Sequence, residues 1–335
     1  MASTRSSKHP GSAPSPQSTA PTQPADTSAR AGQALEWLLH WLPAGMRVKF
    51  RDYLVLTRMD RPIGALLLLW PTWWALWLAA GDFPPWKPLL IFTAGVFTMR
   101  AAGCAINDFA DRKLDPQVAR TAGRPIASGR VRPREALWIF FGLLLISFLL
   151  VLLTNRATIW LSLGGAALAA IYPFCKRHTH LPQVVLGAAF GWSIPMAFSA
   201  VTGHVPALGW LLFLANVLWS VIYDTQYALV DREDDLRAGN KSTAILFGDG
   251  IRAALGLLII IFLAAMFLLG MRAGLAWPYW LALASCAGLF GHQQRLLARG
   301  PDSIGLVAFR NNNWVGLLIW LGIVLAVAIR PLAVI

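Results

Sequence analysis

Hydrophobic segments of about 20 residues recur along most of the chain and constrain its fold more than any other feature. There are nine of them, at 61–80, 89–107, 135–154, 157–174, 182–202, 206–225, 252–270, 275–291 and 314–330. Each is long enough to cross the hydrocarbon core of a bilayer as a helix. Charged residues make up only 13% of the chain, whereas a soluble domain carries about 25%. Because irregular backbone cannot face lipid, the pattern predicts an all-α membrane protein with about nine transmembrane helices.

The N-terminal region differs from the rest of the chain. Residues 1–32 are rich in Ser, Thr, Pro, Ala and Gln without apolar periodicity, which predicts a disordered tail. The tail lacks the apolar core of a secretory signal. An organelle transit peptide is an alternative, but the prolines of the tail argue against the amphipathic helix that such peptides form. Residues 33–57 mix apolar residues with charged ones, which predicts an amphipathic helix in the headgroup layer. The transmembrane domain would then occupy 58–335.

Basic residues predict the orientation of the chain. Its net charge is +13, but the Lys and Arg residues lie between hydrophobic segments rather than on one soluble face, so we expect no nucleic-acid partner. Of these residues, 21 flank the segments on one side of the bilayer, and only four flank them on the other: Lys87, Arg156, Arg272 and Arg330. The positive-inside rule therefore places the N-terminus and the long loops in the cytoplasm, and an odd number of spans places the C-terminus outside.

Two clusters of polar and acidic residues follow the second and the sixth segment. The first comprises Asn107, Asp108, Asp111 and Asp115, and the second comprises Asp224, Asp231, Asp234 and Asp235. If the helices continue past the bilayer, Asn107, Asp111 and Asp115 share one helix face, and Asp224, Asp231 and Asp235 share another. Carboxylates at these spacings repel one another unless a cation binds, and Mg²⁺ prefers a few carboxylates together with substrate phosphate oxygens.

Basic residues accompany both acidic clusters. Arg112, Lys113, Arg120 and Arg124 lie within or after the first, and Arg232 and Lys241 lie near the second. Carboxylates, a divalent cation and guanidinium groups together form a clamp for phosphate or diphosphate. A solvated loop of mixed charge is the alternative for either cluster alone, but the equivalent placement of the two clusters favours a shared ligand.

Three further residues combine charge or aromaticity with an apolar setting. Arg100 lies seven residues before Asn107 inside a hydrophobic segment, where a charge indicates either function or a structural ion pair with the nearby acids. Tyr172 and Lys176 are four residues apart near the cytoplasmic end of the fourth segment. They could present an aromatic face beside an ammonium group, although snorkelling alone would also explain the lysine.

Other residue patterns argue against a disulfide framework, a histidine metal site, a glycine-rich nucleotide-binding loop and a transporter. Cys104, Cys175 and Cys286 are scattered and two lie in or beside apolar runs, so we interpret them as packing residues. The histidines have no metal-binding spacing, and the chain has no glycine-rich phosphate loop. A transporter is a rival from another class, but it predicts acids near the middle of the bilayer rather than at one border.

Two motifs carry a resemblance to a known family. NDFADRKLDPQVARTAGRP (107–125) resembles the first aspartate signature of the UbiA superfamily of intramembrane prenyltransferases, and YDTQYALVDREDD (223–235) resembles the second. The similarity extends to segments 61–77, 100–108, 179–198 and 239–248 and covers essentially everything after Arg58. The segments are most similar to the bacterial members that prenylate 4-hydroxybenzoate in ubiquinone biosynthesis.

The resemblance implies a fold and an activity. The fold is nine transmembrane helices around a central cavity with a cytoplasmic cap, in the bacterial inner membrane. The activity is Mg²⁺-dependent transfer of a polyprenyl group from polyprenyl diphosphate to 4-hydroxybenzoate, at the ring carbon ortho to the hydroxyl, with release of diphosphate. A sister enzyme acting on dihydroxynaphthoate, homogentisate or haem is the alternative within the family, and the prenyl length stays open.

The resemblance also implies roles for individual residues. Metal ligands would be Asn107, Asp108, Asp111, Asp115, Asp224, Asp231 and Asp235, with the role of Asp108 the least defined. Diphosphate ligands would be Arg120, Arg124 and Lys176. Tyr172 would lie near the allylic carbon, Arg100 would line the pocket of the aromatic acceptor, and Asp231 or diphosphate itself would remove the ring proton. Ala228 stands where some relatives carry an acid, so the number of metal ions is open.

Overall fold

The computed structural model describes residues 41, 43–117, 121–239 and 241–332. The chain divides into a unit that ends at Arg47 and a unit from Val48 to Ile335, and the second unit holds the helix bundle and both acidic clusters. The predicted disordered tail, 1–32, lies outside the described residues. Of the predicted interfacial segment, 33–57, the structure describes the helix α2 (Ala44–Leu56), and its position in the headgroup layer stays a prediction.

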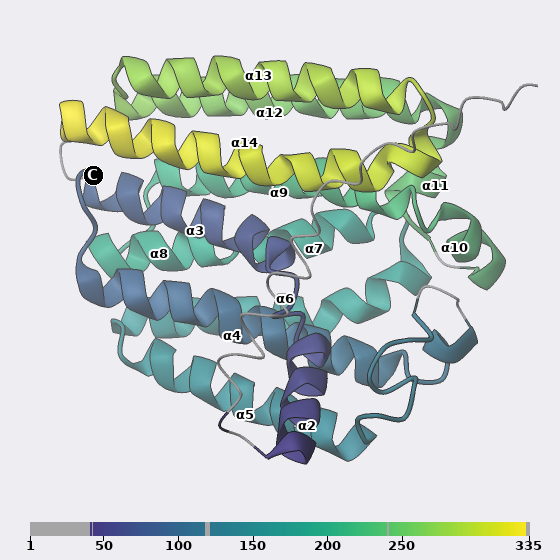
Figure 1. Cartoon of the computed structure of the whole chain (residues 1–335). Coiled ribbons are helices and arrows are strands. Elements are labelled where there is room, and N and C mark those ends of the chain that lie inside the picture. Colours follow the sequence, from purple (N-terminus) through teal and green to yellow (C-terminus); the bar gives the residue numbers. More distant parts are fainter. Residues whose placement is uncertain (1–40, 42, 118–120, 240, 333–335) are drawn as a thin grey trace, which may run out of the picture. The chain divides into compact units, whose positions relative to one another are not determined.

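Helices and their connections make up the described part of the chain, which contains no β-strand (Figure 1). The long helices are α3 (Ile63–Ala80), α4 (Trp86–Ala110), α5 (Pro133–Leu152), α6 (Arg156–His178), α9 (Ala207–Ala228), α12 (Ile251–Ala273), α13 (Trp277–Leu297) and α14 (Pro301–Ile329). The shorter elements are η1 (Asp115–Gln117), α7 (Pro182–Gly191), α8 (Ser193–Thr202), α10 (Arg232–Ala238), α11 (Thr243–Phe247) and η2 (Gly248–Gly250).

Every predicted hydrophobic segment forms a helix, and the segment at 182–202 is divided into α7 and α8. Among the described residues, 7 helices are long and apolar enough to cross a membrane. The two predicted spans outside this group are α6, whose apolar part is the shorter stretch Arg156–Tyr172, and α13, which ends in the polar run 292–295. The all-α membrane fold is confirmed, while the number nine stays a prediction.

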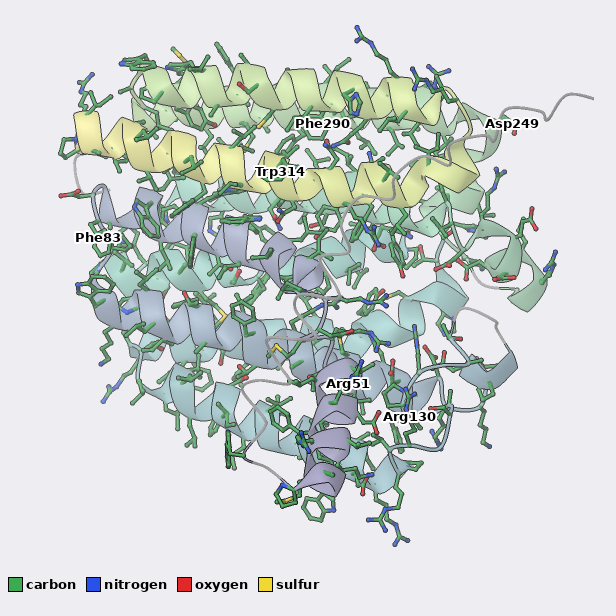
Figure 2. All side chains as sticks on the ribbon, in the orientation of Figure 1. Arg51, Phe83, Arg130, Asp249, Phe290 and Trp314 are labelled. Carbon is green, nitrogen blue, oxygen red and sulfur yellow. The ribbon has the colours of Figure 1, made fainter. Side chains whose placement is uncertain are left out.

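Successive contacts between helices close a ring. In order around it, α3 packs on α4, then come α5, α6, α7, α9, α12, α13 and α14, and α14 packs back on α3. Helix α8 packs against α3, α6 and α9. Figure 2 places Arg130 and Asp249 toward one end of this bundle and Phe83 at the other. The connections that carry charge therefore gather at one end, as the distribution of basic residues predicts.

Three consecutive asparagines of α14 bind three different helices through side-chain hydrogen bonds. Asn311 Oδ1 accepts from Gln293 Nε2 of α13 at 2.9 Å, and Asn313 Oδ1 accepts from Trp70 Nε1 of α3 at 3.0 Å. Between them, Asn312 Oδ1 accepts from Trp219 Nε1 at 3.0 Å, and its Nδ2 donates to Gln226 Oε1 at 2.8 Å, both on α9. Because polar groups inside a membrane bundle need protein partners, these bonds select one register of α14 against its neighbours.

Replacing Asn312 with alanine should lower the stability of the bundle. Asn312 is fully buried, and its loss leaves Trp219 Nε1 and Gln226 Oε1 without that partner, at a cost of about 1–3 kcal/mol. Thermal unfolding of the detergent-purified protein should show a Tm lower by several degrees. Ser285→Ala, at an exposed position of α13, is the matched control and should leave Tm unchanged. An equal Tm for the two variants would contradict the role of Asn312.

Candidate active site

The two acidic clusters lie at the same end of the bundle. The first begins in the last turn of α4 and continues into the connection after it, and the second begins near the C-terminal end of α9 and continues into α10. Figure 1 shows the connection after α4 and the helix α10 at the same end of the helix ring. The equivalent placement predicted from sequence is therefore observed in the fold.

Neither cluster continues its helix as the spacing predicts. Helix α4 ends at Ala110, and Asp111 is its C-terminal cap, donating its backbone N–H to the Asn107 carbonyl at 2.9 Å. Asp115 then begins the separate turn η1. The prediction of one continuous face through Asn107, Asp111 and Asp115 is thus wrong for Asp115, because the chain leaves the helix after its cap.

The second cluster is interrupted in the same way. Helix α9 ends at Ala228, and Asp231 is the N-cap of the new helix α10. The Asp231 carbonyl accepts a hydrogen bond from the backbone N–H of Asp235 at 2.8 Å, so these two residues belong to one turn. The prediction of a single helical face through Asp224, Asp231 and Asp235 is therefore also wrong, because a turn separates Asp224 from the other two.

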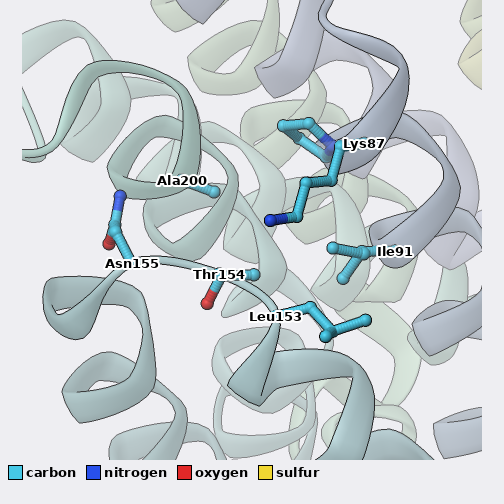
Figure 3. A pocket seen from close by; sticks show the side chains of 7 residues that line it. Lys87, Ile91, Leu153, Thr154, Asn155 and Ala200 are labelled. Atoms are coloured by element: carbon cyan, nitrogen blue, oxygen red, sulfur yellow. The ribbon is translucent and has the colours of Figure 1, made fainter.

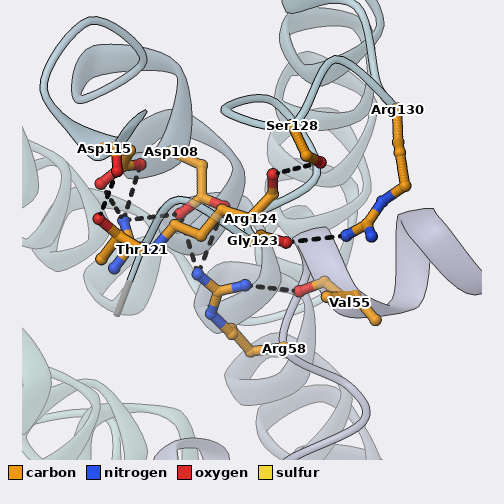
Figure 4. Close-up of polar contacts among 9 residues, drawn as sticks. All are labelled: Val55, Arg58, Asp108, Asp115, Thr121, Gly123, Arg124, Ser128 and Arg130. Carbon is orange, nitrogen blue, oxygen red and sulfur yellow. Dashed lines mark hydrogen bonds and ion pairs between the residues drawn. The ribbon is translucent and has the colours of Figure 1, made fainter. Parts of the chain in front are cut away.

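One guanidinium group joins two carboxylates of the first cluster (Figure 4). Arg124 Nη1 lies 3.0 Å from Asp115 Oδ2 and 3.2 Å from Asp108 Oδ1. Arg58 Nη2 approaches Asp108 from the other side, 3.1 Å from Oδ1. Asp108 is only 2% exposed and Asp115 is 5% exposed, so both carboxylates are shielded from water. Paired arginines compensate the cost of burying these charges.

The two arginines paired with Asp108 make it a residue that helps to hold the connection after α4. Its role as a ligand of Mg²⁺ stays a prediction. Arg58, a residue with φ of 57°, also donates Nη1 to the Val55 carbonyl at 2.7 Å. Sequence reasoning treated Arg58 only as a flanking charge, because its partner lies 50 residues away.

Helix α2 supports the same connection through ion pairs. Arg130 Nε lies 3.0 Å from Asp52 Oδ1, and Lys49 Nζ lies 2.9 Å from Glu135 Oε2 at the start of α5. Leu56 of α2 packs with Ala105, Ile126 and Val131 in a small apolar cluster beneath these pairs. The segment predicted as interfacial therefore contacts α4, α5 and the connection between them.

The remaining predicted ligands are more accessible. Asn107 and Asp111 are exposed, while Asp224, Asp231 and Asp235 are half-buried. Within the described part of the chain, no group of three or more His, Cys, Asp or Glu residues is close enough to hold a metal ion. Arg120 and the side chain of Lys176 lie outside the described residues. The donors are amide and carboxylate oxygens, which suit Mg²⁺, an ion that usually binds to proteins together with substrate phosphate oxygens.

Arg100 has no acidic partner among the described residues. Its Nε is buried without a hydrogen bond, and its Cζ lies 5.7 Å from the centre of the Phe190 ring of α7. The structural alternative, an ion pair with the first cluster, is not observed, because Asp108 binds Arg58 and Arg124 instead. A guanidinium within a transmembrane helix and without a described acid is a candidate site for an anionic ligand.

Tyr223 connects Arg100 with the other predicted site residues. It is 2% exposed, and its hydroxyl lies 3.0 Å from the Ser220 hydroxyl on α9. Arg100, Tyr172 and Asp224 are all close enough to interact with Tyr223 electrostatically. Residues of α4, α6 and α9 therefore lie within electrostatic range of one buried tyrosine. Sequence reasoning gave Tyr223 no role, although it opens the second aspartate motif.

A hollow of about 270 Å³ lies at the opposite end of α4 (Figure 3). It is lined by Lys87, Pro88, Ile91, Leu153, Thr154, Asn155 and Ala200. Because these residues belong to the start of α4, the connection between α5 and α6, and α8, the hollow is separate from the acidic clusters.

Residues 68–320 match the UbiA prenyltransferase family. The chain belongs to this family. It is 58% identical over 279 residues to a 4-hydroxybenzoate octaprenyltransferase of Xanthomonas euvesicatoria pv. vesicatoria (strain 85-10), covering 83% of this chain and 93% of the relative. It is 57% identical over 271 residues to a protein of the same name from Klebsiella pneumoniae subsp. pneumoniae, covering 81% of this chain and 94% of the relative. The resemblance carried by the two aspartate motifs is confirmed.

Solved UbiA structures share the fold. The apo structure of a UbiA homolog from Aeropyrum pernix K1 aligns with a TM-score of 0.69 and 27% identity, covering 78% of this chain and 98% of the homolog. A UbiA homolog from Archaeoglobus fulgidus, solved with GPP and Mg²⁺, aligns with a TM-score of 0.57 and 16% identity, covering 83% and 99%. The helix ring of this chain is thus the UbiA arrangement.

Replacing Asp108 with asparagine should loosen the connection between α4 and α5. A neutral amide cannot compensate the positive charges of Arg58 and Arg124. Breaking a buried ion pair costs about 3–5 kcal/mol of stability. The cost should be smaller here because both arginines are partly exposed. Limited trypsin digestion of purified protein should cleave faster between residues 112 and 132. Asp249→Asn, at an exposed position outside this connection, is the control, and equal cleavage of the two variants would contradict the assignment.

Proposed function

We propose that this UbiA-family enzyme transfers a polyprenyl group from polyprenyl diphosphate to 4-hydroxybenzoate, at the ring carbon ortho to the hydroxyl, and releases diphosphate. The observation that carries the proposal is the 57–58% identity to 4-hydroxybenzoate octaprenyltransferases over more than nine-tenths of their length. Octaprenyl diphosphate is accordingly the first donor to test. The product belongs to ubiquinone biosynthesis.

The acidic end of the bundle provides the diphosphate site. We assign Asn107, Asp111, Asp115, Asp224, Asp231 and Asp235 to Mg²⁺ bound jointly with the diphosphate, and Arg120, Arg124 and Lys176 to the diphosphate itself. Asp115 Oδ2 lies 3.0 Å from Arg124 Nη1. When diphosphate binds, Arg124 would either leave Asp115 or contact both groups. The contacts of Arg124 with described carboxylates use only Nη1, which leaves the rest of the guanidinium to donate to phosphate oxygens.

Charge stabilisation at this site would favour cleavage of the allylic C–O bond. When bound, Mg²⁺ would supply positive charge to the oxygens of the leaving diphosphate. Arg124 would donate hydrogen bonds to the same group, so that its growing negative charge meets fixed donors. Tyr172, half-buried on α6, would turn its ring toward the allylic carbon, where a ring face stabilises positive charge.

Acceptor recognition falls to the buried end of the site. The guanidinium of Arg100 would bind the carboxylate of 4-hydroxybenzoate, which supplies the missing acid in the apolar interior. The ring carbon beside the phenol oxygen would then attack the allylic carbon, and its proton would pass to Asp231 or to diphosphate. The helix bundle would exclude water from the allylic cation.

The protein is a multi-pass membrane protein, and we propose its location in more detail. Residues 58–335 would form the transmembrane domain in the bacterial inner membrane, with the polyprenyl tail in contact with lipid. The N-terminus and the acidic end would face the cytoplasm, and the C-terminus the periplasm, because the basic residues gather at the acidic end.

Loss of either acidic cluster should abolish prenyl transfer. Purified protein supplied with octaprenyl diphosphate, radiolabelled 4-hydroxybenzoate and Mg²⁺ should form prenylated product, and EDTA should prevent it. Asp111→Asn and Asp231→Asn should each lower turnover about 100-fold or more, because each weakens stabilisation of the leaving group. Asp249→Asn, a substitution of an acid outside both clusters, is the control. Turnover of Asp111→Asn and Asp231→Asn equal to the parent would refute the diphosphate site.

Arg100→Ala should weaken the use of a carboxylated acceptor. The KM for 4-hydroxybenzoate should rise about tenfold or more, since the variant loses a charge-assisted hydrogen bond. The KM for the polyprenyl diphosphate should not change, because Arg100 lies on α4 about two turns before Asn107. Identical acceptor saturation curves for variant and parent would remove this assignment.

A further inference from the structure

Gly64, in the first turn of α3, faces the guanidinium group of Arg100. A Cβ atom built at Gly64 would lie 2.7 Å from Arg100 Nη2, 2.9 Å from Nε and 3.2 Å from Cζ. Real Cβ atoms essentially never approach other atoms closer than 3.0 Å. The guanidinium therefore occupies space that exists only because residue 64 has no side chain.

The backbone of α3 does not itself require glycine at this position. Gly64 is helical and is not among the positive-φ glycines, so an L-amino acid could adopt its conformation. Glycine weakens a helix relative to alanine, which makes its presence in an α-helical span unfavourable unless something else needs the space. The atoms that occupy this space belong to Arg100 and not to the α4 backbone.

The surroundings of Arg100 explain why its exact position matters. No described acid fixes the guanidinium, and its Nε has no hydrogen-bond partner. Its described neighbours include Gly64 of α3, on the side where a Cβ would clash, and the Phe190 ring of α7. Packing therefore sets the direction of its donors, which an ion pair would otherwise do, and a guanidinium recognises a carboxylate only in a defined geometry.

We propose that Gly64 is a specificity-determining position: by leaving room for the guanidinium, it aims Arg100 at the carboxylate of the aromatic acceptor. This inference rests on the proposed function. Gly64 is a positioning residue that acts through Arg100. A larger residue would displace the end of a flexible side chain rather than backbone, so the fold should survive while discrimination for a carboxylated acceptor is lost.

The test compares Gly64→Ala, Arg100→Ala and the double variant in the purified protein. Gly103→Ala is the matched control, because it adds the same methyl group to α4, one turn from Arg100, where a Cβ meets nothing within 4 Å. For each variant, the KM for 4-hydroxybenzoate, the KM for polyprenyl diphosphate and kcat/KM for an uncharged phenol, 4-methylphenol, are measured. Calorimetric titration with 4-hydroxybenzoate gives a reading independent of turnover.

We expect Gly64→Ala to raise the KM and Kd for 4-hydroxybenzoate about tenfold, with the KM for the diphosphate and the use of 4-methylphenol unchanged. Gly103→Ala should match the parent. In the double variant the acceptor KM should equal that of Arg100→Ala, because two changes that act through one group do not add. An unchanged acceptor KM in Gly64→Ala, or additive effects in the double variant, would overturn the inference.

The outcomes separate this inference from the function beneath it. If Arg100→Ala leaves the acceptor KM unchanged, the acceptor assignment fails and the role of Gly64 fails with it. If Arg100→Ala raises that KM and Gly64→Ala does not, only the role of Gly64 fails. Should Gly64→Ala not fold while the double variant folds, the clash with Arg100 is demonstrated. If neither folds, Gly64 serves helix packing and the inference is wrong.

Discussion

Polar groups buried in a membrane-spanning bundle have no water to bind, so most need a partner within the protein, and this constraint organises the structure. Asn311, Asn312 and Asn313 satisfy it by binding α13, α9 and α3, which holds α14 in one register. At the border of the apolar region, Asp108 satisfies it with Arg58 and Arg124. Helix α9, which carries Asp224, is thus fixed by its neighbours before any ligand is considered.

Arg100 does not meet this constraint, because its buried Nε has no hydrogen-bond partner. For this reason we propose that Arg100 marks the acceptor end of the site. Its guanidinium lies within a transmembrane helix, beside Gly64 and Phe190. An uncompensated cation in an apolar setting is costly unless a ligand supplies the anion. In the function proposed above, the carboxylate of 4-hydroxybenzoate would supply that anion, and the electrostatic cost of Arg100 would then favour a carboxylated acceptor.

At the acidic end, in contrast to Arg100, the buried carboxylates have partners of opposite charge within the protein. Among the described residues, the carboxylates of this end do not form a group of three close enough to hold a metal ion by themselves. Asp115 is instead paired with Arg124. We propose that Mg²⁺ binds there jointly with the diphosphate, and the exposed Asn107 and Asp111 are accessible to both.

The sequence by itself determined the class of fold, the apolar segments and the placement of both acidic clusters after helices at one end, because hydropathy and charge are local properties of the chain. It did not determine where α4 and α9 end, and the continuous helical faces expected through Asp115 and Asp231 are absent, since caps and turns interrupt them. The pairing of Asp108 with Arg58, the lack of an acid beside Arg100 and the space at Gly64 were decided only by tertiary structure. Each of these depends on distances between residues far apart in sequence, which packing alone sets.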